Sequence, residues 1–234
     1  MKFKAVIFDL FGTLVNSFGA AAGQMGTELA AALAVPYDPF IALWNKTLEM
    51  RIVGEFDTVE ANIEYVCEKI GLRPDAERIR AAVEIRMSYV RQALKPKPDA
   101  VKTPSQLKNQ GYTVGLISNC SPEIPALWHE TAFADIIDKP VFSCRARLRK
   151  PDTRIYQLAC DQFGITPDSC LYVADGEDHE LSAAAEVGLH PVLIRTAGER
   201  PTGGSHQEAR EWQGNAISTL TEVLGLVGGL SDRS

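Results

Sequence analysis

Residues 5–15, AVIFDLFGTLV, join a short apolar run to a polar turn and carry the strongest prediction about the fold. The run AVIF is fully apolar, which is typical of a strand in a parallel sheet covered on both faces. Asp9 follows the run directly, and the chain then turns at Gly12 and Thr13. We therefore expect a buried strand that ends on a carboxylate at the edge of a sheet.

The second half of the chain alternates between helical and strand-like segments. The apolar runs YTVGLIS (112–118), KPVFS (139–143), CLYVA (170–174) and HPVLIR (190–195) each follow a segment with helical periodicity. Such alternation predicts parallel βαβ units and a doubly wound sheet. The strand at 5–8 has no partner nearby in sequence, so we expect it to join this sheet. The predicted fold class is α/β, with a Rossmann-like doubly wound parallel sheet.

Residues 17–92 have a different character, with four segments whose apolar residues recur at helical spacing and no strand among them. The stretch KPKPDA (95–100) follows as a linker, because its prolines disfavour helix. We predict a core formed by residues 1–16 and 93–234, into which residues 17–92 are inserted as a helical domain.

Composition and charge limit the classes of function. The 234 residues are 45% hydrophobic and 23% charged, as in ordinary soluble globular proteins. A formal net charge of -6 gives no long-range attraction for nucleic acid or an anionic membrane surface. No apolar run near the start is long enough for a signal peptide or a membrane-spanning helix. We expect a cytoplasmic protein, monomeric or homodimeric, whose partner is a small anionic molecule rather than nucleic acid or membrane.

Polar side chains follow the predicted strands at the edge where parallel sheets bind ligands. They are Asp9, Ser118 with Asn119, Lys150 and Asp175. A carboxylate can act as a nucleophile, a hydroxyl and a lysine can bind oxyanions, and a second carboxylate can complete a divalent cation site. The five cysteines form no C-x-x-C pair and the four histidines are scattered, so any metal is expected to have oxygen ligands.

Four motifs, in this order, resemble those of the haloacid dehalogenase superfamily. They are DLFGTL (9–14), ISN (117–119), RKPD (149–152) and ADGEDHE (174–180). The resemblance extends over the whole chain, with residues 17–92 corresponding to the four-helix-bundle cap of that family. It implies a hydrolase in which Asp9 attacks the substrate and forms a covalent aspartyl intermediate.

The resemblance also implies the composition of the active site. The catalytic positions would be Asp9, Phe11, Thr13, Ser118, Asn119, Lys150, Asp175 and Glu180. The cofactor would be Mg²⁺, bound by the carboxylate of Asp9, the backbone carbonyl of Phe11 and the carboxylate of Asp175. Glu180, about one helical turn beyond, would orient a metal-bound water or Lys150.

Phe11 departs from the phosphatases of the family, most of which carry a second Asp there as general acid and base. Phenylalanine cannot transfer a proton, and such help is typically worth about 10² to 10⁴ in rate. The dehalogenases of the family carry an aromatic residue at this place and work without metal. Three alternatives follow: a phosphatase whose leaving group needs no proton, a hydrolase of carbon–halogen bonds, and a binding or regulatory module with little turnover.

The last motif favours the first alternative. This chain has ADG at 174–176, with the carboxylate of Asp175, whereas the dehalogenases have a sequence that resembles SSN there. Beside Asp9, the Asp175 carboxylate would be repelled without a cation. Those dehalogenases also carry an Arg directly after a cap Trp, whereas here Trp44 is followed by Asn45. We therefore expect a Mg²⁺-dependent phosphatase that acts on a small phosphorylated metabolite.

The helical segment offers weaker signals for substrate recognition. The candidates for binding the distal end of the substrate are Asn45, Lys46 and Arg51. Arg51 could substitute for the missing cap arginine, but a charge on a solvated helix face is the simpler interpretation.

Overall fold

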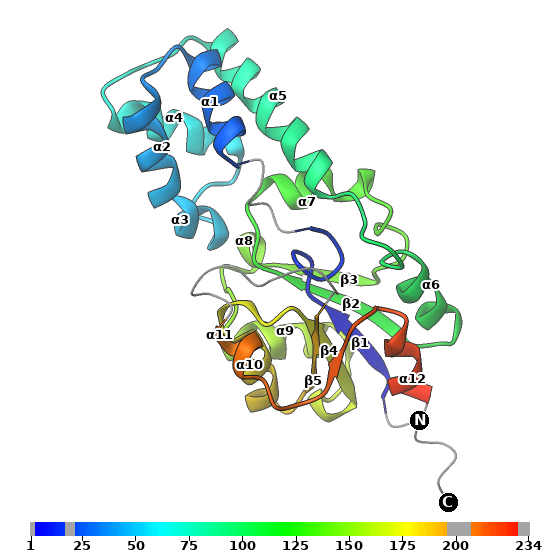
Figure 1. Cartoon of the computed structure of the whole chain (residues 1–234). Helices are drawn as coiled ribbons and strands as arrows, with labels where there is room; N and C mark the ends of the chain where they lie inside the picture. Colours follow the sequence, from blue (N-terminus) through cyan, green and yellow to red (C-terminus); the bar gives the residue numbers. More distant parts are fainter. Residues whose placement is uncertain (1–2, 17–21, 196–206, 229–234) are drawn as a thin grey trace, which may run out of the picture.

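A computed structural model describes residues 3–16, 22–195 and 207–228 of the chain. Figure 1 shows two units, one built around a β-sheet and one made of helices, with the helical unit above one end of the sheet. Residues 17–21, with which the predicted helical domain begins, lie outside the described residues.

The sheet is parallel throughout and has the strand order β3-β2-β1-β4-β5-β6. Its strands are β1 (Ala5–Phe8), β2 (Thr113–Ser118), β3 (Lys139–Phe142), β4 (Cys170–Ala174), β5 (His190–Ile194) and β6 (Ala216–Ile217). The predicted α/β class is confirmed, and the first strand does join the sheet formed by the second half of the chain. It lies in the middle, between β2 and β4. The short strand β6 was not predicted, because two residues carry no periodic signal.

Both faces of the sheet are covered, which explains why its strands are mainly apolar. In β1, Val6 and Phe8 belong to one hydrophobic cluster, and Ala5 and Ile7 belong to another. The first cluster includes residues of α6 (Lys102–Asn109), α7 (Glu123–Leu127), α8 (Ser143–Ala146) and α12 (Glu222–Gly228). The second includes residues of α9 (Thr153–Phe163), α10 (Glu180–Val187) and α11 (Gln207–Glu211). Each cluster therefore forms the core on one side of the sheet.

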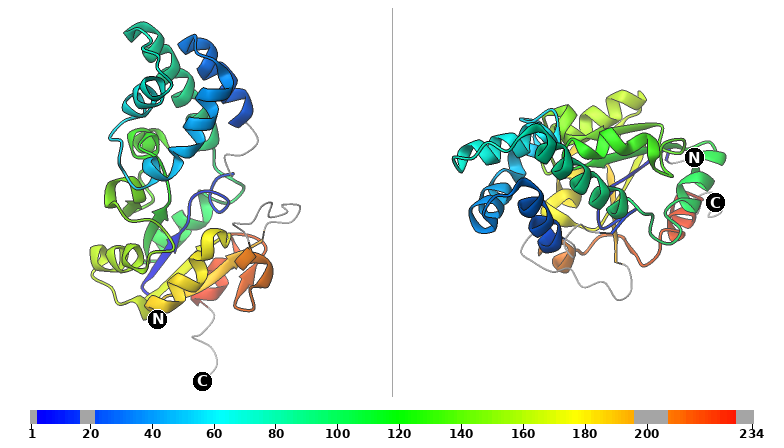
Figure 2. Two further views of the ribbon diagram at one scale, coloured as in Figure 1. Left: turned by 90° about the vertical axis from the view of Figure 1, so that its left-hand side faces the viewer. Right: turned by 90° about the horizontal axis from the view of Figure 1, so that it is seen from above.

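The helical unit, which we call the cap, has a hydrophobic core of its own around residues such as Leu29, Phe40 and Ile63. Its helices are α1 (Ala22–Leu33), α2 (Tyr37–Lys46), α3 (Leu48–Ile52), α4 (Val59–Lys69) and α5 (Ala76–Ala93). The views in Figure 2 show these helices gathered apart from the sheet. Among the described residues, no helix combines the length and apolar character that crossing a membrane requires.

The second helical segment of the cap is divided into α2 and α3 at Thr47, where the sequence predicts one continuous run. The Thr47 hydroxyl donates a hydrogen bond to the Trp44 carbonyl at 2.9 Å, and the Arg51 guanidinium donates to the same oxygen at 2.8 Å. Side chains that bond to carbonyls one turn back compete with the helical ladder and bend it. The break therefore follows from polar contacts that hydrophobic periodicity does not register.

The two chain segments that connect core and cap lie side by side. Val15 forms an antiparallel bridge with Pro96, and the backbone N–H of Lys97 donates to the carbonyl of Leu14 at 2.9 Å. The Lys97 ammonium donates to the carbonyl of Gly12 at 2.5 Å. The predicted linker is thus bonded directly to the loop that follows Asp9.

Candidate active site

Asp9 lies at the centre of the sheet because β1 is the middle strand. Its backbone N–H donates to the carbonyl of Val173 at 2.9 Å, which continues the pairing with β4. The Asp9 side chain is 7% exposed. Its Oδ1 accepts a hydrogen bond from Lys150 at 2.5 Å, whereas Oδ2 is buried without a hydrogen-bond partner among the described residues. A buried carboxylate oxygen without a donor is costly unless a ligand completes it.

Lys150 links Asp9 to a second buried carboxylate. Its ammonium donates to Oε2 of Glu180 at 2.5 Å and to the hydroxyl of Tyr172 at 3.2 Å. Glu180 also accepts from the Tyr172 hydroxyl at 2.6 Å and, through Oε1, from the backbone N–H of Gly176 at 3.1 Å. Both oxygens of Glu180 are therefore occupied, and this side chain fixes the position of the Lys150 ammonium.

The loop after β2 holds the backbone of Lys150 in place. The side chain of Asn119 accepts from the Lys150 backbone N–H at 2.8 Å and donates to its carbonyl at 3.0 Å. Ser118 and Thr13 are fully buried, and within the described chain their hydroxyls have no hydrogen-bond partner. These two hydroxyls could donate to the oxygens of an anion bound beside Asp9.

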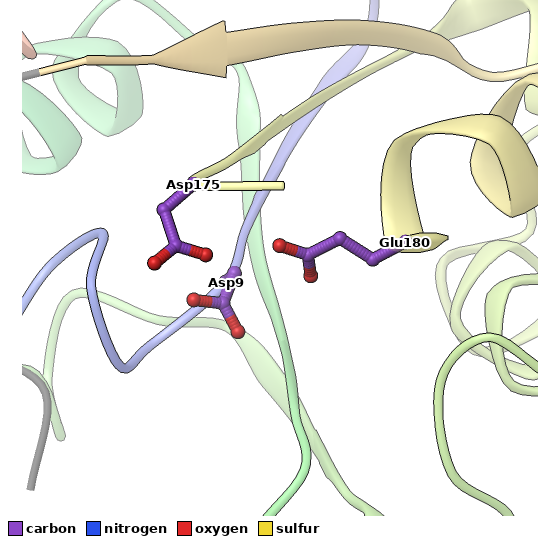
Figure 3. Close-up of side chains that lie close together, drawn as sticks. All are labelled: Asp9, Asp175 and Glu180. Carbon is purple, nitrogen blue, oxygen red and sulfur yellow. The ribbon is translucent and has the colours of Figure 1, made fainter. Parts of the chain in front are cut away.

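Three carboxylates converge at this edge of the sheet. One oxygen each from Asp9, Asp175 and Glu180 lies within 4.8 Å of the others, and Figure 3 shows the carboxylates of Asp175 and Glu180 on either side of Asp9. Gly12 allows the close approach of Asp175: a Cβ built on it would lie 1.9 Å from Asp175 Oδ2, and its φ of +82° also favours glycine. We call Asp9, Asp175 and Glu180, together with Lys150, the acidic cluster.

The acidic cluster has the donor set of a hard divalent cation. Carboxylate oxygens are the ligands that Mg²⁺ prefers, and Asp9 offers an oxygen that lacks any other partner in the described structure. The residues present therefore fit a Mg²⁺ ion. Both oxygens of Glu180 already accept hydrogen bonds, from Lys150, Tyr172 and Gly176, whereas Asp9 Oδ2 has no partner in the described structure.

Burial shifts the pKa values of the acidic cluster. It raises the pKa of Asp9 to about 6, because lost hydration outweighs the attraction of Lys150, and Asp175 adds repulsion. It also raises the pKa of Glu180 well above its usual range. Burial disfavours the charged form of Lys150, but Asp9 and Glu180 outweigh it and raise the pKa of its ammonium. Lys150 therefore stays charged, and Asp9 is the carboxyl group that an added cation would ionise.

Phe11 brings an aromatic ring to the loop where a general acid would stand. The ring is half-buried and packs against the hydrophobic cluster that contains Val6 and Phe8. The backbone of Phe11 forms a bridge with Val15, which closes the loop after Asp9. No proton can be donated from this side chain.

Of the three cap candidates, the structure separates Arg51 from the other two. Asn45 and Lys46 are exposed, whereas Arg51 is only 4% exposed. Its Nη1 donates to the Trp44 carbonyl, to the Thr47 hydroxyl at 2.8 Å and to the side-chain oxygen of Asn62 at 2.9 Å. The interpretation of Arg51 as a solvated helix charge is therefore wrong, because these buried acceptors draw the guanidinium into the cap.

Arg51 belongs to a second buried charged group, formed between cap and core. Arg86 of α5 donates to Oε1 of Glu123 on α7 at 2.5 Å, and Glu123 is 1% exposed. The guanidiniums of Arg51 and Arg86 lie 4.3 and 5.8 Å from the ring centre of Trp44. Burial, with the repulsion of Arg86, lowers the pKa of Arg51 to about 10. We call Arg51, Arg86 and Glu123 the arginine cluster.

Sequence reasoning missed several polar residues in and next to the two clusters. Tyr172 stands inside an apolar strand, Lys97 within a proline linker, and Arg86 within an ordinary amphipathic helix. Glu123 follows the ISN motif by four residues and opens α7. Only Lys97 carried a usable signal. It stands between two prolines, which disfavour helix, so it cannot be explained as a solvated charge on a helix face.

Comparison with known proteins gives the class. The family model described as haloacid dehalogenase-like hydrolase matches residues 3–188. The chain therefore belongs to the haloacid dehalogenase-like hydrolases.

Proteins similar to this chain include dehalogenases and phosphatases. (S)-2-haloacid dehalogenase 4A of Burkholderia cepacia is 26% identical over 204 residues, which cover 85% of each chain. Glyceraldehyde 3-phosphate phosphatase of Methanopyrus kandleri is 25% identical over 201 residues, which cover 82% of this chain and 84% of that protein.

A solved structure supports the fold. A HAD family enzyme of Bacteroides thetaiotaomicron, in complex with magnesium and inorganic phosphate, has a TM-score of 0.64 at 19% identity, covering 85% of this chain and 96% of that chain. Sequence and fold comparison thus identify the family, and the reaction has to be argued from the site.

Proposed function

We propose that this hydrolase is a Mg²⁺-dependent phosphatase of a small phosphorylated metabolite. The observation that carries the proposal is the acidic cluster, in which Asp175 and Asp9 converge and Asp9 Oδ2 has no other partner among the described residues. Carboxylates that converge at a buried site repel one another, and a divalent cation bound by them removes that repulsion.

The ion would be held by the carboxylates of Asp9 and Asp175, with the backbone carbonyl of Phe11 as a further ligand. When bound, it supplies positive charge that neutralises the phosphoryl group and ionises the nucleophile. Glu180 stays outside this ligand set, since its oxygens already accept from Lys150, Tyr172 and Gly176.

In the proposed reaction, Asp9 attacks phosphorus and the ester oxygen leaves, which forms an aspartyl phosphate. Lys150 and the hydroxyl of Ser118 bind the phosphoryl oxygens, and Glu180 keeps the lysine in position. Water then attacks the acyl phosphate, releases inorganic phosphate and restores the carboxylate. The buried placement of Asp9 limits the access of competing water to the first step.

Phe11 restricts the leaving group, because it cannot give a proton to the departing oxygen. We infer that the natural substrate has an acidic leaving group, such as an acyl or enol phosphate, or brings its own proton. An alkyl phosphate would leave as an alkoxide and would react slowly, since general acid help is worth about 10² to 10⁴ in rate.

The arginine cluster supports a substrate with a second anionic group. It holds two guanidiniums against one carboxylate, and Arg51 is in no ion pair with a described residue. Its Nε is buried without a hydrogen-bond partner in the described part of the chain. A carboxylate on the distal end of the substrate would complement this charge. Asn45 and Lys46 remain weaker candidates for the same role.

Carbon–halogen hydrolysis is the second candidate, and one observation favours it. The relative from Burkholderia cepacia is named as a haloacid dehalogenase. A halide leaves without a proton, so an aromatic residue such as Phe11 in place of a general acid is compatible with this reaction. In that reaction Asp9 attacks carbon and forms an ester. The third candidate function is a binding or regulatory module with little turnover, and only the absence of a general acid at position 11 supports it.

The test is a panel of phosphates and 2-haloacids, assayed with Mg²⁺ and with EDTA. Phosphate release that EDTA abolishes supports the phosphatase. Halide release that EDTA leaves unchanged contradicts it and supports the dehalogenase. If neither product forms but a panel compound raises the melting temperature, the binding module replaces both.

A further inference from the structure

Arg149 connects three parts of the active site through one guanidinium. Its Nε donates to the backbone carbonyl of Lys150 at 3.1 Å, and Nη2 donates to Oδ2 of Asp178 at 2.7 Å. Its Nη1 forms an ion pair with Glu49 of the cap helix α3. Arg149 and Asp178 lie within two of the motifs, but no step of the proposed reaction accounts for these contacts.

The contact with Asp178 bears on the metal-binding side of the site. Asp178 lies between Asp175 and Glu180, in the loop that links β4 to α10. Its φ is +51°, and that of His179 is +59°. Two successive non-glycine residues in the left-handed region cost conformational energy. The ion pair with Arg149 compensates part of this cost, so the shape of the loop depends on that arginine.

The contact with Glu49 brings the cap into the same arrangement. Glu49 lies on α3, whose neighbour in the core is α8. The Glu49 side chain is 57% exposed, so water screens the ion pair and its contribution to stability is small. Its consequence is geometric: placing α3 against the core fixes the guanidinium that also holds Asp178 and the Lys150 carbonyl.

Building on the proposed function, we propose that Arg149 is a positioning residue that couples closure of the cap to the placement of Lys150 and of the loop carrying Asp175. When α3 lies against the core, Glu49 and Asp178 hold the guanidinium from two sides. When α3 moves away, the guanidinium loses one of these partners and the loop loses part of its support. The catalytic groups are then best ordered while the cap covers the substrate.

The chain offers a matched control for this coupling. Arg91 of α5 pairs with Glu130, which follows α7, at 2.8 Å, so this ion pair also joins cap and core. Its side chains are 45% and 39% exposed, comparable with those of Arg149 and Glu49. It contacts neither Lys150 nor the loop of Asp178.

The first experiment needs no substrate. Hydrogen–deuterium exchange of the full chain is measured by mass spectrometry for wild type, Glu49→Gln and Glu130→Gln. We expect Glu49→Gln to accelerate exchange in residues 174–180 about two- to five-fold, the range expected from losing an exposed ion pair, although Glu49 does not touch that segment. Glu130→Gln leaves that segment unchanged. Unchanged exchange in Glu49→Gln, or equal acceleration in both variants, would overturn the coupling.

The second experiment uses the substrate found with the panel. Arg149→Lys keeps the charge, but a compact ammonium cannot serve Glu49, Asp178 and the Lys150 carbonyl together. We expect kcat to fall about two- to five-fold with KM little changed, whereas Arg91→Lys keeps the wild-type kcat. A wild-type kcat in Arg149→Lys would contradict the proposal. If the wild type releases no phosphate, the proposed function fails, while the exchange experiment still decides the coupling.

Discussion

The acidic cluster and the arginine cluster differ in the balance of their buried charges. At the edge of the sheet, three carboxylates converge, and the Lys150 ammonium pairs with two of them. Between cap and core, two guanidiniums face one carboxylate. An excess of buried negative charge favours a bound cation, and an excess of positive charge favours a bound anion.

The two clusters also have different proposed roles in the reaction. In the acidic cluster, Asp9 and Asp175 directly follow the central strands β1 and β4, which holds them rigidly for chemistry. The arginine cluster instead draws its residues from two units, the cap and the core. We therefore expect changes in the first to alter kcat and metal binding, and changes in the second to alter KM.

The largest expected effect is that of Asp9→Asn. An amide cannot form the aspartyl intermediate, so kcat falls by at least about 10⁴-fold. The assay is steady-state turnover, with circular dichroism to show that the fold persists. Activity retained by a folded variant would remove Asp9 as the nucleophile.

Phe11→Asp adds a carboxyl group to the acidic cluster at the position of the missing acid. Turnover of an alkyl phosphate is expected to rise by about 10² to 10⁴, whereas that of p-nitrophenyl phosphate changes little because its leaving group needs no proton. Phe11→Asn is the matched control, since it has nearly the same shape and no transferable proton. A variant that folds, binds Mg²⁺ and gains nothing would show that Phe11 does not limit the reaction.

Asp175→Asn tests whether the negative excess serves a cation. Removing a residue that only hydrogen-bonds to a metal ligand typically weakens metal binding by about 10- to 100-fold. Losing a ligand itself should cost more, so we expect Mg²⁺ binding to weaken by about 100-fold or more. Calorimetry measures this without turnover. Glu177→Gln, which removes one charge from an exposed residue of the same loop, should keep the wild-type affinity. Equal loss in both variants would mean that only the overall charge matters.

Arg51→Gln tests the positive excess between cap and core. We expect KM for a substrate with a distal carboxylate to rise about 10-fold with kcat nearly unchanged, because a charge-assisted hydrogen bond is lost. Arg73→Gln, at an exposed cap arginine, is the control. A lower melting temperature with an unchanged KM would make Arg51 a structural residue of the cap.

The smallest expected effect is on the pH profile. The pKa of Asp9 is about 6, and the carboxyl is protonated and unreactive below it. At limiting Mg²⁺, kcat/KM should therefore rise with pH and reach half its maximum near pH 6. Saturating Mg²⁺ favours the carboxylate, lowers its pKa and moves this limb to lower pH. If Mg²⁺ does not move this limb of the pH profile, the cation does not bind at Asp9.

Much of the fold was predictable from the sequence because it depends on local apolar runs. The strands after β1 appear within one residue of their predicted bounds, apart from the two residues of β6. The break at Thr47 and the network of Tyr172 were not predictable. Both rest on hydrogen bonds made by side chains, which leave no periodic pattern in the sequence.

By itself, the sequence determined the α/β fold, the family and the order of the polar residues at the carboxyl ends of the strands. These follow from apolar periodicity and from short motifs, which are local. Only the tertiary structure decided that Lys97 reaches Gly12, that Arg51 is buried and that Arg149 joins Glu49 to Asp178. Each of these contacts joins separate elements of the fold, so it exists only once the chain has folded and cap and core have come together.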